Sequence, residues 1–515
     1  MDARATELLL PDGVRASGAA ELLAGAVAAV AQRAGVIERT FWDTFDGRLH
    51  AAGLALAAMG GRLVLIDAAT HAERASAEHR GADAKRLLLG DLPPGDLREQ
   101  LAPVVEMRAL TPIARVRSRR LPVDVLDEAG EIVVRLRAEE PTALPRRGEG
   151  RLLRPRLHVV AVPGHDADFE RVLHALTGEL GLRSAPRPVL DDAVAAIGGA
   201  VGGTSSKVRV ALAPDERADA AAVAILRRLL AIIEANLPGA LADVDSEFLH
   251  DLRVAVRRSR ALQRELRGVF APEPLRAFRD EFRELQAITG PTRDLDVQLL
   301  GFDELAAGLG DGAGDVAPLR ELLARRLARE RRAMVAGLRS ERTRALLAAW
   351  GDFLDGLVGA PEGDRPDATR PVADVAGERI ARVYRRMVEM GRAIDDDSPH
   401  EALHDLRKKG KELRYLLEFF ASLYPRDVVK PMVATLKRLQ DVLGRFQDRE
   451  VHADVLRALG NEIASTEGGR AALGAVSVLV ERLDAQQEQA RAEFAASFAE
   501  FAAKPQRTRV AETFG

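Results

Sequence analysis

The segment HDLRVAVRRSRALQREL, residues 250–266, has a counterpart later in the chain, HDLRKKGKELRYLLEFF, residues 404–420. The two begin 154 positions apart, and the same offset recurs downstream. It relates Leu285, Gln286, Gly290, Asp294 and Val297 to Leu439, Gln440, Gly444, Asp448 and Val451. An unchanged offset means that no net insertion separates the two motifs. We therefore predict a duplication that forms two similar helical subdomains related by an approximate two-fold axis.

Each copy predicts an amphipathic helix with a basic face. At 100° per residue the basic residues of the first copy fall within a sector about 80° wide, opposite an apolar packing face. These residues are His250, Arg253, Arg257, Arg260 and Arg264. In the second copy the same sector holds His404, Arg407, Lys411 and Arg414, with Lys408 beside it and Glu418 in place of Arg264.

Further basic residues align outside these helices. Arg276 corresponds to Lys430 and Arg283 to Lys437, whereas Arg293 has Gln447 as its counterpart. The residues before each basic helix also predict its start: Asp243 or Asp245 caps the first, and Ser398, Pro399 and Glu401 form a capping box for the second.

A stripe of like charges predicts a counter-ion, because cations at helical i, i+3 and i+4 spacing repel each other by a few tenths of a kcal/mol per pair. Polyphosphate carries about one negative charge per phosphate unit, and guanidinium groups bind its oxygens in bidentate fashion. Pairing with acidic residues on neighbouring helices is the alternative, and the histidines are alternatively core residues bonded to a carbonyl. We expect no metal site, because neither histidine has a second histidine or a carboxylate pair at i+3 or i+4.

Length, composition and net charge limit the class of protein. A chain of 515 residues is too long for one hydrophobic core, and its 47% hydrophobic and 30% charged residues are typical of folded globular domains. The net charge is only -3, so the distribution of charge matters more than its total. The absence of cysteine excludes disulfides and thiolate metal sites. No apolar run approaches the roughly 20 residues of a membrane span, so we expect a cytoplasmic protein without membrane contact.

The pattern of apolar and polar residues divides the chain into two predicted domains, a linker and a tail. Residues 1–197 mix short β-like runs with helical segments and predict an α+β domain with a largely antiparallel sheet. The Gly-rich residues 198–214 predict a linker. Residues 215–502 predict an all-helical domain of two halves, 215–358 and 372–502, and residues 503–515 a flexible tail. Strands are expected at 6–10, 62–66, 104–108, 131–137 and 157–162, and helices at 19–34 and 168–180.

The repeated motifs, H-D-L-R-V-x-x-R-R-x-R, L-Q-x-x-x-G-x-x-R-D-x-D-V and H-D-L-R-K-x-x-K-x-L-R-Y, resemble the CHAD family, the conserved histidine α-helical domain, over about residues 215–502. The resemblance implies two pseudo-symmetric four-helix bundles whose basic surface binds inorganic polyphosphate, in some members at polyphosphate granules. It places ligand contacts at His250, Arg253, Arg257, Arg258 and Arg260, and at His404, Arg407, Lys408, Lys411 and Arg414.

The segment FWDTFDGRLHAAGLAL, residues 41–56, resembles a pattern of the CYTH family, a triphosphate tunnel fold that often precedes CHAD domains. Other CYTH positions differ. Glu7, Leu9 and Pro11 stand where that family has Glu-x-Glu-x-Lys, and Ala57 and Met59 stand where it has a basic pair. Triphosphate hydrolysis requires a carboxylate cluster for a metal ion and several cations. We therefore expect a degenerate, non-catalytic CYTH-like domain without cofactors, which is structural or contacts an unidentified protein partner.

Four functions follow as hypotheses. The leading one is non-catalytic polyphosphate binding, possible targeting to granules included, with a larger contribution from the arginine-richer first copy. The others are triphosphate or polyphosphate hydrolysis by the N-terminal domain, nucleic-acid binding, and a purely structural scaffold. Nucleic acid is disfavoured because aromatic residues total only 4% and none interleaves with the basic faces.

Overall fold

The computed structural model describes residues 4–79, 84–465 and 469–515. The chain forms two compact units, residues 1–205 and 206–515, and each is described separately. The boundary between the units lies inside the predicted linker, residues 198–214. These residues contain neither helix nor strand.

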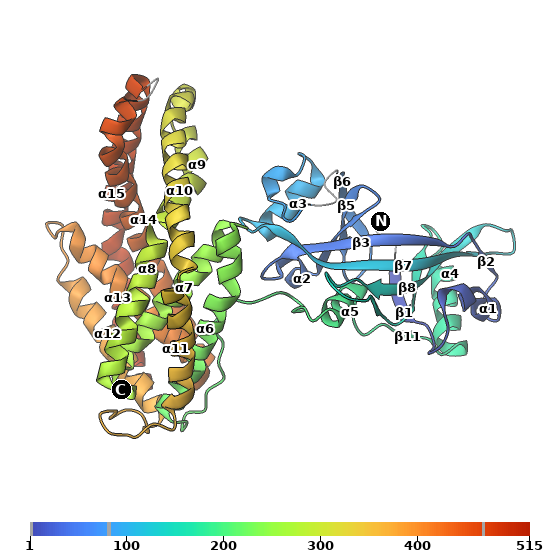
Figure 1. The fold of residues 1–515 in the computed structure, drawn as a ribbon, viewed down its shortest axis with the longest axis horizontal. Coiled ribbons are helices and arrows are strands. Elements are labelled where there is room, and N and C mark those ends of the chain that lie inside the picture. The colour runs from blue at the N-terminus through green and yellow to red at the C-terminus, as the bar shows by residue number, and fades with distance from the viewer. Residues whose placement is uncertain (1–3, 80–83, 466–468) are drawn as a thin grey trace. The chain divides into compact units, whose positions relative to one another are not determined.

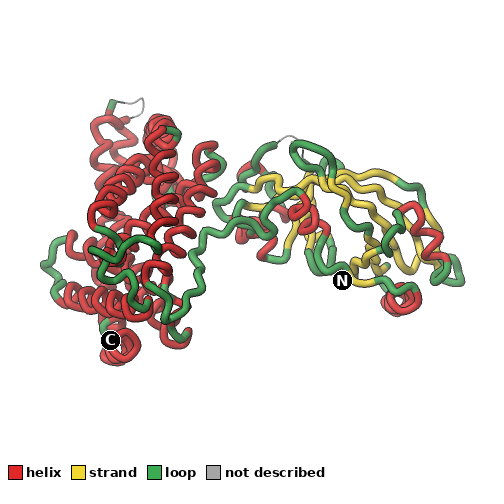
Figure 2. Tube along the Cα trace, turned by 60° about the horizontal axis from the view of Figure 1, so that its bottom comes forward, coloured by secondary structure: helices red, strands yellow, loops and turns green. Residues whose placement is uncertain are grey.

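The N-terminal unit is a curled antiparallel sheet (Figures 1 and 2). The strand order is β11-β1-β10-β8-β7-β3-β4-β5-β6, with β2 paired to β7 and β9 to β8. The strands are β1 Ala5–Leu9, β2 Ala29–Ala31, β3 Gly35–Thr44, β4 Leu54–Met59, β5 Arg62–Asp67, β6 Glu73–Glu78, β7 Leu110–Leu126, β8 Ile132–Ala143, β9 Arg151–Leu152, β10 Arg156–Ala161 and β11 Arg183–Ser184. The helices are α1 Ala19–Ala24, α2 Arg48–Ala51, α3 Asp96–Val105, α4 Asp166–His174 and α5 Val189–Ala196.

The predicted antiparallel α+β architecture is confirmed, with local corrections. Four of the expected strands correspond to β1, β5, β8 and β10. The strand expected at 104–108 was wrong, because α3 extends to Val105 and Glu106 then adopts a left-handed backbone with φ 52°. The helix expected at 19–34 ends at Ala24, and the chain continues into β2.

Charged residues lie inside this unit. Glu139 on β8 is fully buried and accepts hydrogen bonds from Arg39, from Ser118 at 2.6 Å and from Arg120 at 3.1 Å. Arg156 on β10, also fully buried, donates to Glu7 at 2.9 Å and to Asp192 at 2.8 Å. Burial, followed by the charge of Arg120, lowers the pKa of Arg39 to about 9. These carboxylates are therefore committed to internal ion pairs.

The helical unit shows the predicted duplication directly. Three consecutive helices begin 154 positions apart in the two halves: α6 Ala218–Ala242 and α12 Val372–Arg392, α7 Ser246–Glu265 and α13 His400–Phe419, α8 Pro272–Leu300 and α14 Arg426–Ala464. The first half continues with α9 Phe302–Ala307, α10 Ala317–Leu338 and α11 Glu341–Leu357. The second half continues with α15 Gly469–Phe501 and α16 Lys504–Phe514.

The halves share a core at one end of the unit. There α14 and α15 extend beside α9 and α10 (Figure 1), and Phe302, Leu319 and Leu323 pack with Leu456 and Leu479. The flexible tail predicted for residues 503–515 was wrong. These residues form α16, which packs against α12, because Val510 and Phe514 at i and i+4 give it an apolar face that is buried.

The helix starts were predicted correctly in one copy only. Asp245 caps α7, because its side chain accepts from the backbone N–H groups of Glu247 at 2.9 Å and Phe248 at 3.1 Å. The capping box at Ser398 was wrong, because α13 begins at His400 and the Ser398 hydroxyl bonds instead with Asp395 at 2.7 Å. In the part of the chain that the structure describes, no helix has the length and apolarity of a membrane span.

Replacement of Glu139 by glutamine tests the buried ion pairs. Glu139→Gln removes the carboxylate that is bonded to the buried Arg39, and we expect a loss of about 3–5 kcal/mol in the unfolding free energy of the N-terminal unit. The matched control is Glu38→Gln, which removes an exposed ion pair with Arg117 and should change stability by less than about 1 kcal/mol. Denaturant unfolding of both variants measures the difference, and equal effects would show that Glu139 contributes no more than a surface ion pair.

Candidate anion-binding site

The two basic helices α7 and α13 contact each other within the helical unit, and each also packs against the next helix of its own half, α8 or α14 (Figure 1). Their apolar faces hold them there, with Leu252 and Val256 on α7 and Leu406 and Leu413 on α13 all buried. The packing brings the basic residues of both copies to one seam.

Two ion pairs cross this seam. Arg258 donates to Glu418, and Arg264 lies 2.6 Å from Glu412. By the 154-residue offset, Glu412 is equivalent to Arg258 and Glu418 to Arg264, so the pairs are related by the pseudo-two-fold axis with the charges exchanged. The Arg258 guanidinium also lies 5.3 Å from the centre of the Tyr415 ring. Part of the predicted stripe is thus engaged in holding the two copies together.

Arg257 and Lys411, also equivalent to each other, behave differently. Within the described residues, neither side chain forms an ion pair or a hydrogen bond, and the Arg257 Nε atom is buried without a partner. Burial, followed by the positive charges of Arg407 and Arg257, lowers the pKa of Lys411 to about 8. The seam therefore contains cations of both copies that repel each other.

The arginines of the two H-D-L-R motifs flank this pair. Arg253 donates from Nη1 to the Gln286 carbonyl at 2.9 Å and to the Thr289 hydroxyl at 2.8 Å. Arg407 donates to Asp448 at 3.0 Å. The Arg253 guanidinium lies close to Gly290, and the Arg407 guanidinium lies close to the equivalent Gly444. In each repeat the downstream motif therefore contacts the H-D-L-R motif, which explains why both motifs recur at the same offset.

Farther along α7, Arg260 donates to the side-chain oxygen of Gln286. Burial, then the nearby Arg264, Arg283 and Arg279, lowers the pKa of Arg260 from its usual value. Arg276 and Arg283 of α8 lie with these residues around one hollow, together with Arg279, which the repeat comparison did not predict.

The remaining predicted residues are placed less favourably for a ligand. Arg293 donates to the Ser246 carbonyl at 3.2 Å and lies 3.6 Å from Glu247, so it is occupied at the start of α7. His404 bonds through Nδ1 to Gln447, and burial lowers its pKa. Lys408 pairs with Asp405 at 3.1 Å. His250 on α7 is half-buried, Arg414 lies 3.5 Å from Glu418, and Lys430 and Lys437 are exposed on α14.

Sequence reasoning missed the partners of these cations. Gln286 and Asp448 were visible only as repeat markers, and Thr289 gave no signal because Leu443 is its counterpart. Glu412 and Glu418 stood within the second basic segment, and reading them as counter-ions required knowing that α7 and α13 touch.

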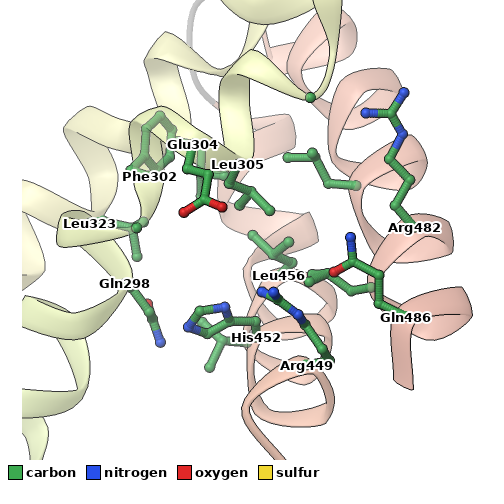
Figure 3. Close-up of a pocket in the computed structure, with 16 residues that line it drawn as sticks. Gln298, Phe302, Glu304, Leu305, Leu323, Arg449, His452, Leu456, Arg482 and Gln486 are labelled. Carbon is green, nitrogen blue, oxygen red and sulfur yellow. The ribbon is translucent and has the colours of Figure 1, made fainter. Parts of the chain in front are cut away.

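A different kind of pocket lies at the shared end of the two halves (Figure 3). Its walls are largely apolar, with Phe302, Leu305 and Leu456 among them, and Arg449 and His452 also line it. Burial lowers the pKa of His452, which favours its neutral form. This pocket has fewer cations than the α7–α13 seam, so the seam is the candidate anion-binding site.

The fold and this seam define a duplicated helical domain with clustered cations, and comparison with known proteins agrees. The CHAD domain model matches residues 224–457, so the helical unit contains a CHAD domain. The crystal structure of the CHAD domain from the plant Ricinus communis superposes with a TM-score of 0.50 at 26% identity, covering 58% of this chain and 96% of that one. PptA from Streptomyces chartreusis gives a TM-score of 0.43 at 16% identity, covering 55% of this chain and 99% of that one.

Two curated relatives, uncharacterized proteins MT2285 and Rv2226 of Mycobacterium tuberculosis strains, are 33% identical over 225 residues. The match covers 40% of this chain and 39% of theirs, so the similarity spans well under half of their length. The sheet of the N-terminal unit is consistent with the CYTH resemblance.

The burial of Lys411, together with repulsion by its cationic neighbours, predicts a gain in stability when its charge is removed. The unfolded chain holds this proton to about pH 10.5 and the folded chain releases it near pH 8, so the stability contributed by this group rises between those values. At pH 7 we expect Lys411→Met to raise the unfolding free energy by up to about 1 kcal/mol, whereas Lys408→Met has little effect. Urea unfolding measures both, and a lower stability of Lys411→Met would show that Lys411 is held by favourable contacts.

Proposed function

We propose that this protein binds inorganic polyphosphate without catalysis, through the seam between α7 and α13. The CHAD family is associated with polyphosphate binding. The observation that carries the proposal is the pair Arg257 and Lys411: equivalent, half-buried cations from the two copies that form no direct ion pair among the described residues. A bound polyanion offsets their mutual repulsion and that of Arg253 and Arg407 beside them.

The geometry suits a flexible linear polyanion better than nucleic acid. The free cations lie along a seam formed by two helices, and Tyr415, the aromatic residue beside them, is buried and covered by Arg258 and Arg414. Among the described residues, bases therefore find no exposed ring to stack on at the seam, whereas phosphate oxygens need only the cations. Binding of this kind also provides the attachment by which the protein would associate with polyphosphate granules.

The proposed absence of catalysis rests on the N-terminal unit. The buried Glu7 and Glu139 and the half-buried Asp192 are each bonded to an arginine, which competes with any divalent cation for their oxygens. In the described ranges no three His, Asp or Glu side chains are grouped to hold a metal ion. We assign this unit a structural role or a role in contacting a protein partner.

Titration with long-chain polyphosphate tests the seam. We expect the variant Arg253→Ala/Arg257→Ala/Arg407→Ala/Lys411→Ala to bind at least about 100-fold more weakly, because charge-assisted contacts contribute about 1.5–3 kcal/mol each. Affinity of the parent should fall roughly tenfold or more between about 50 and 200 mM salt. Isothermal titration with polyphosphate, repeated with single-stranded DNA as competitor, measures both.

A variant with the same loss of charge elsewhere provides the control. Arg320, Arg325, Arg344 and Arg386 are exposed and pair with carboxylates on the surface, so their replacement by alanine removes four cations without touching the seam. Polyphosphate affinity equal in the two variants would reject the seam as the site and indicate attraction by net charge alone.

The pH dependence of binding is a separate prediction. A polyanion favours the protonated form of Lys411, so affinity should be constant below pH 8 and decrease as pH rises above about 8, where free Lys411 loses its proton. Lys411→Arg keeps its charge throughout and should abolish the decrease. Titrations at pH 7, 8 and 9 measure it, and the same decrease in Lys411→Arg would assign the pH dependence to another group.

A further inference from the structure

The hollow between α7 and α8 is lined mainly by arginine side chains. Arg260 and Arg264 reach it from α7, and Arg276, Arg279 and Arg283 from α8, around a cavity of about 250 Å³. Among the described residues that line it, Asp280 is the one carboxylate, and it is bonded to Arg283 at 2.7 Å. The hollow thus brings several guanidinium groups together around one solvent-accessible space.

Local pairing does not neutralise these arginines. Arg264 has Glu412 and Glu265 as partners, but Arg260 bonds to the uncharged side chain of Gln286. Arg276 and Arg279 form no ion pair within the described ranges of the chain. Three other arginines of the hollow depress the pKa of Arg260 in addition to its burial, which shows that the groups interact. A compact ligand with several negative charges would relieve this repulsion.

The second repeat does not reproduce the hollow. The positions equivalent to its five arginines are occupied by Arg414, Glu418, Lys430, Val433 and Lys437. A carboxylate and an apolar residue thus replace two of the cations. A general track for phosphate chains would be expected in both copies, so the arginine hollow of the first repeat points to a ligand group of its own.

The chemistry of phosphoanhydrides supplies such a group. An interior phosphate of a linear chain carries one negative charge, whereas a terminal phosphate has a second ionisation near pH 6 and so carries nearly two at neutral pH. Several convergent guanidinium groups match the higher charge and the free oxygens of an end. We propose that the hollow binds the terminal triphosphate group of a phosphoanhydride chain.

This inference rests on the proposed function in that polyphosphate is one source of such an end. A nucleoside triphosphate is the other source with the same chemistry. The hollow gives the protein a preference for chain ends, while the seam binds the interior of the chain.

The test compares ligands with and without ends. Tripolyphosphate has two terminal phosphates and cyclic trimetaphosphate has none, and both are titrated into the full chain at pH 7. The parent should bind tripolyphosphate at least about tenfold more tightly than trimetaphosphate. Arg276→Gln/Arg283→Gln should lose at least about tenfold in tripolyphosphate affinity, whereas Lys430→Gln/Lys437→Gln, at the equivalent positions, should lose less than about twofold. All four side chains are exposed, so the fold should be retained.

Ionisation of the end adds a second readout. Tripolyphosphate affinity should increase from pH 5 to pH 7 in the parent, as the terminal phosphates lose their second proton near pH 6, and this increase should vanish in Arg276→Gln/Arg283→Gln. ATP competing with tripolyphosphate would identify nucleotides as a source of the group, and ATP failing to compete would leave the polyphosphate end as the source.

The outcomes separate the two proposals. Equal affinity for tripolyphosphate and trimetaphosphate, or equal losses in the two double variants, would overturn the end site while long-chain binding at the seam stands. Loss of long-chain binding in the seam variant, with tripolyphosphate binding intact, supports two distinct sites. If the seam variant keeps its long-chain affinity and tripolyphosphate still depends on Arg276 and Arg283, the end site stands and the seam proposal fails.

Discussion

Electrostatic repulsion between two cationic helices is the constraint on which the helical unit depends. Burial of their apolar faces forces α7 and α13 together, and this places arginine and lysine side chains of both copies in a partly desolvated seam. Charges interact more strongly there than in bulk water. The repulsion is therefore either offset by carboxylates or lowers the stability of the fold. Glu412 and Glu418 offset it for Arg258 and Arg264, whereas for Arg257 and Lys411 it remains.

The paired and the unpaired cations both lie between the same two helices, α7 and α13. Because the ion pairs are related by the pseudo-two-fold axis, exchanging arginine for glutamate at equivalent positions joins the copies without adding a new element. The cost is that the copies are no longer equivalent, since Glu418 removes from the second copy a cation that Arg264 supplies in the first. The asymmetry between the repeats thus follows from how they are held together.

Sequence reasoning predicted what depends on periodicity and failed where tertiary contact decides. The offset of 154 residues predicted the duplication, and the structure adds that three pairs of helices begin at this offset. The sequence predicted the basic faces of the two helices but not the carboxylates that pair with them. Glu412 contacts Arg264 only because the two copies pack against each other. The tail after residue 502 was misread because two apolar residues, Val510 and Phe514, gave too weak a pattern to reveal α16.

The N-terminal unit shows why the content of charged residues alone does not predict binding. Arg39, Arg120 and Arg156 are buried or half-buried, yet each is bonded to a buried or half-buried carboxylate, so the interior offers a ligand little uncompensated charge. In the seam, comparable side chains lack that compensation. The net charge of the whole chain, -3, averages over both situations and conceals the difference. We therefore expect affinity for a polyanion to depend on which cations the fold leaves unpaired, and the helical unit leaves such cations where its two copies meet.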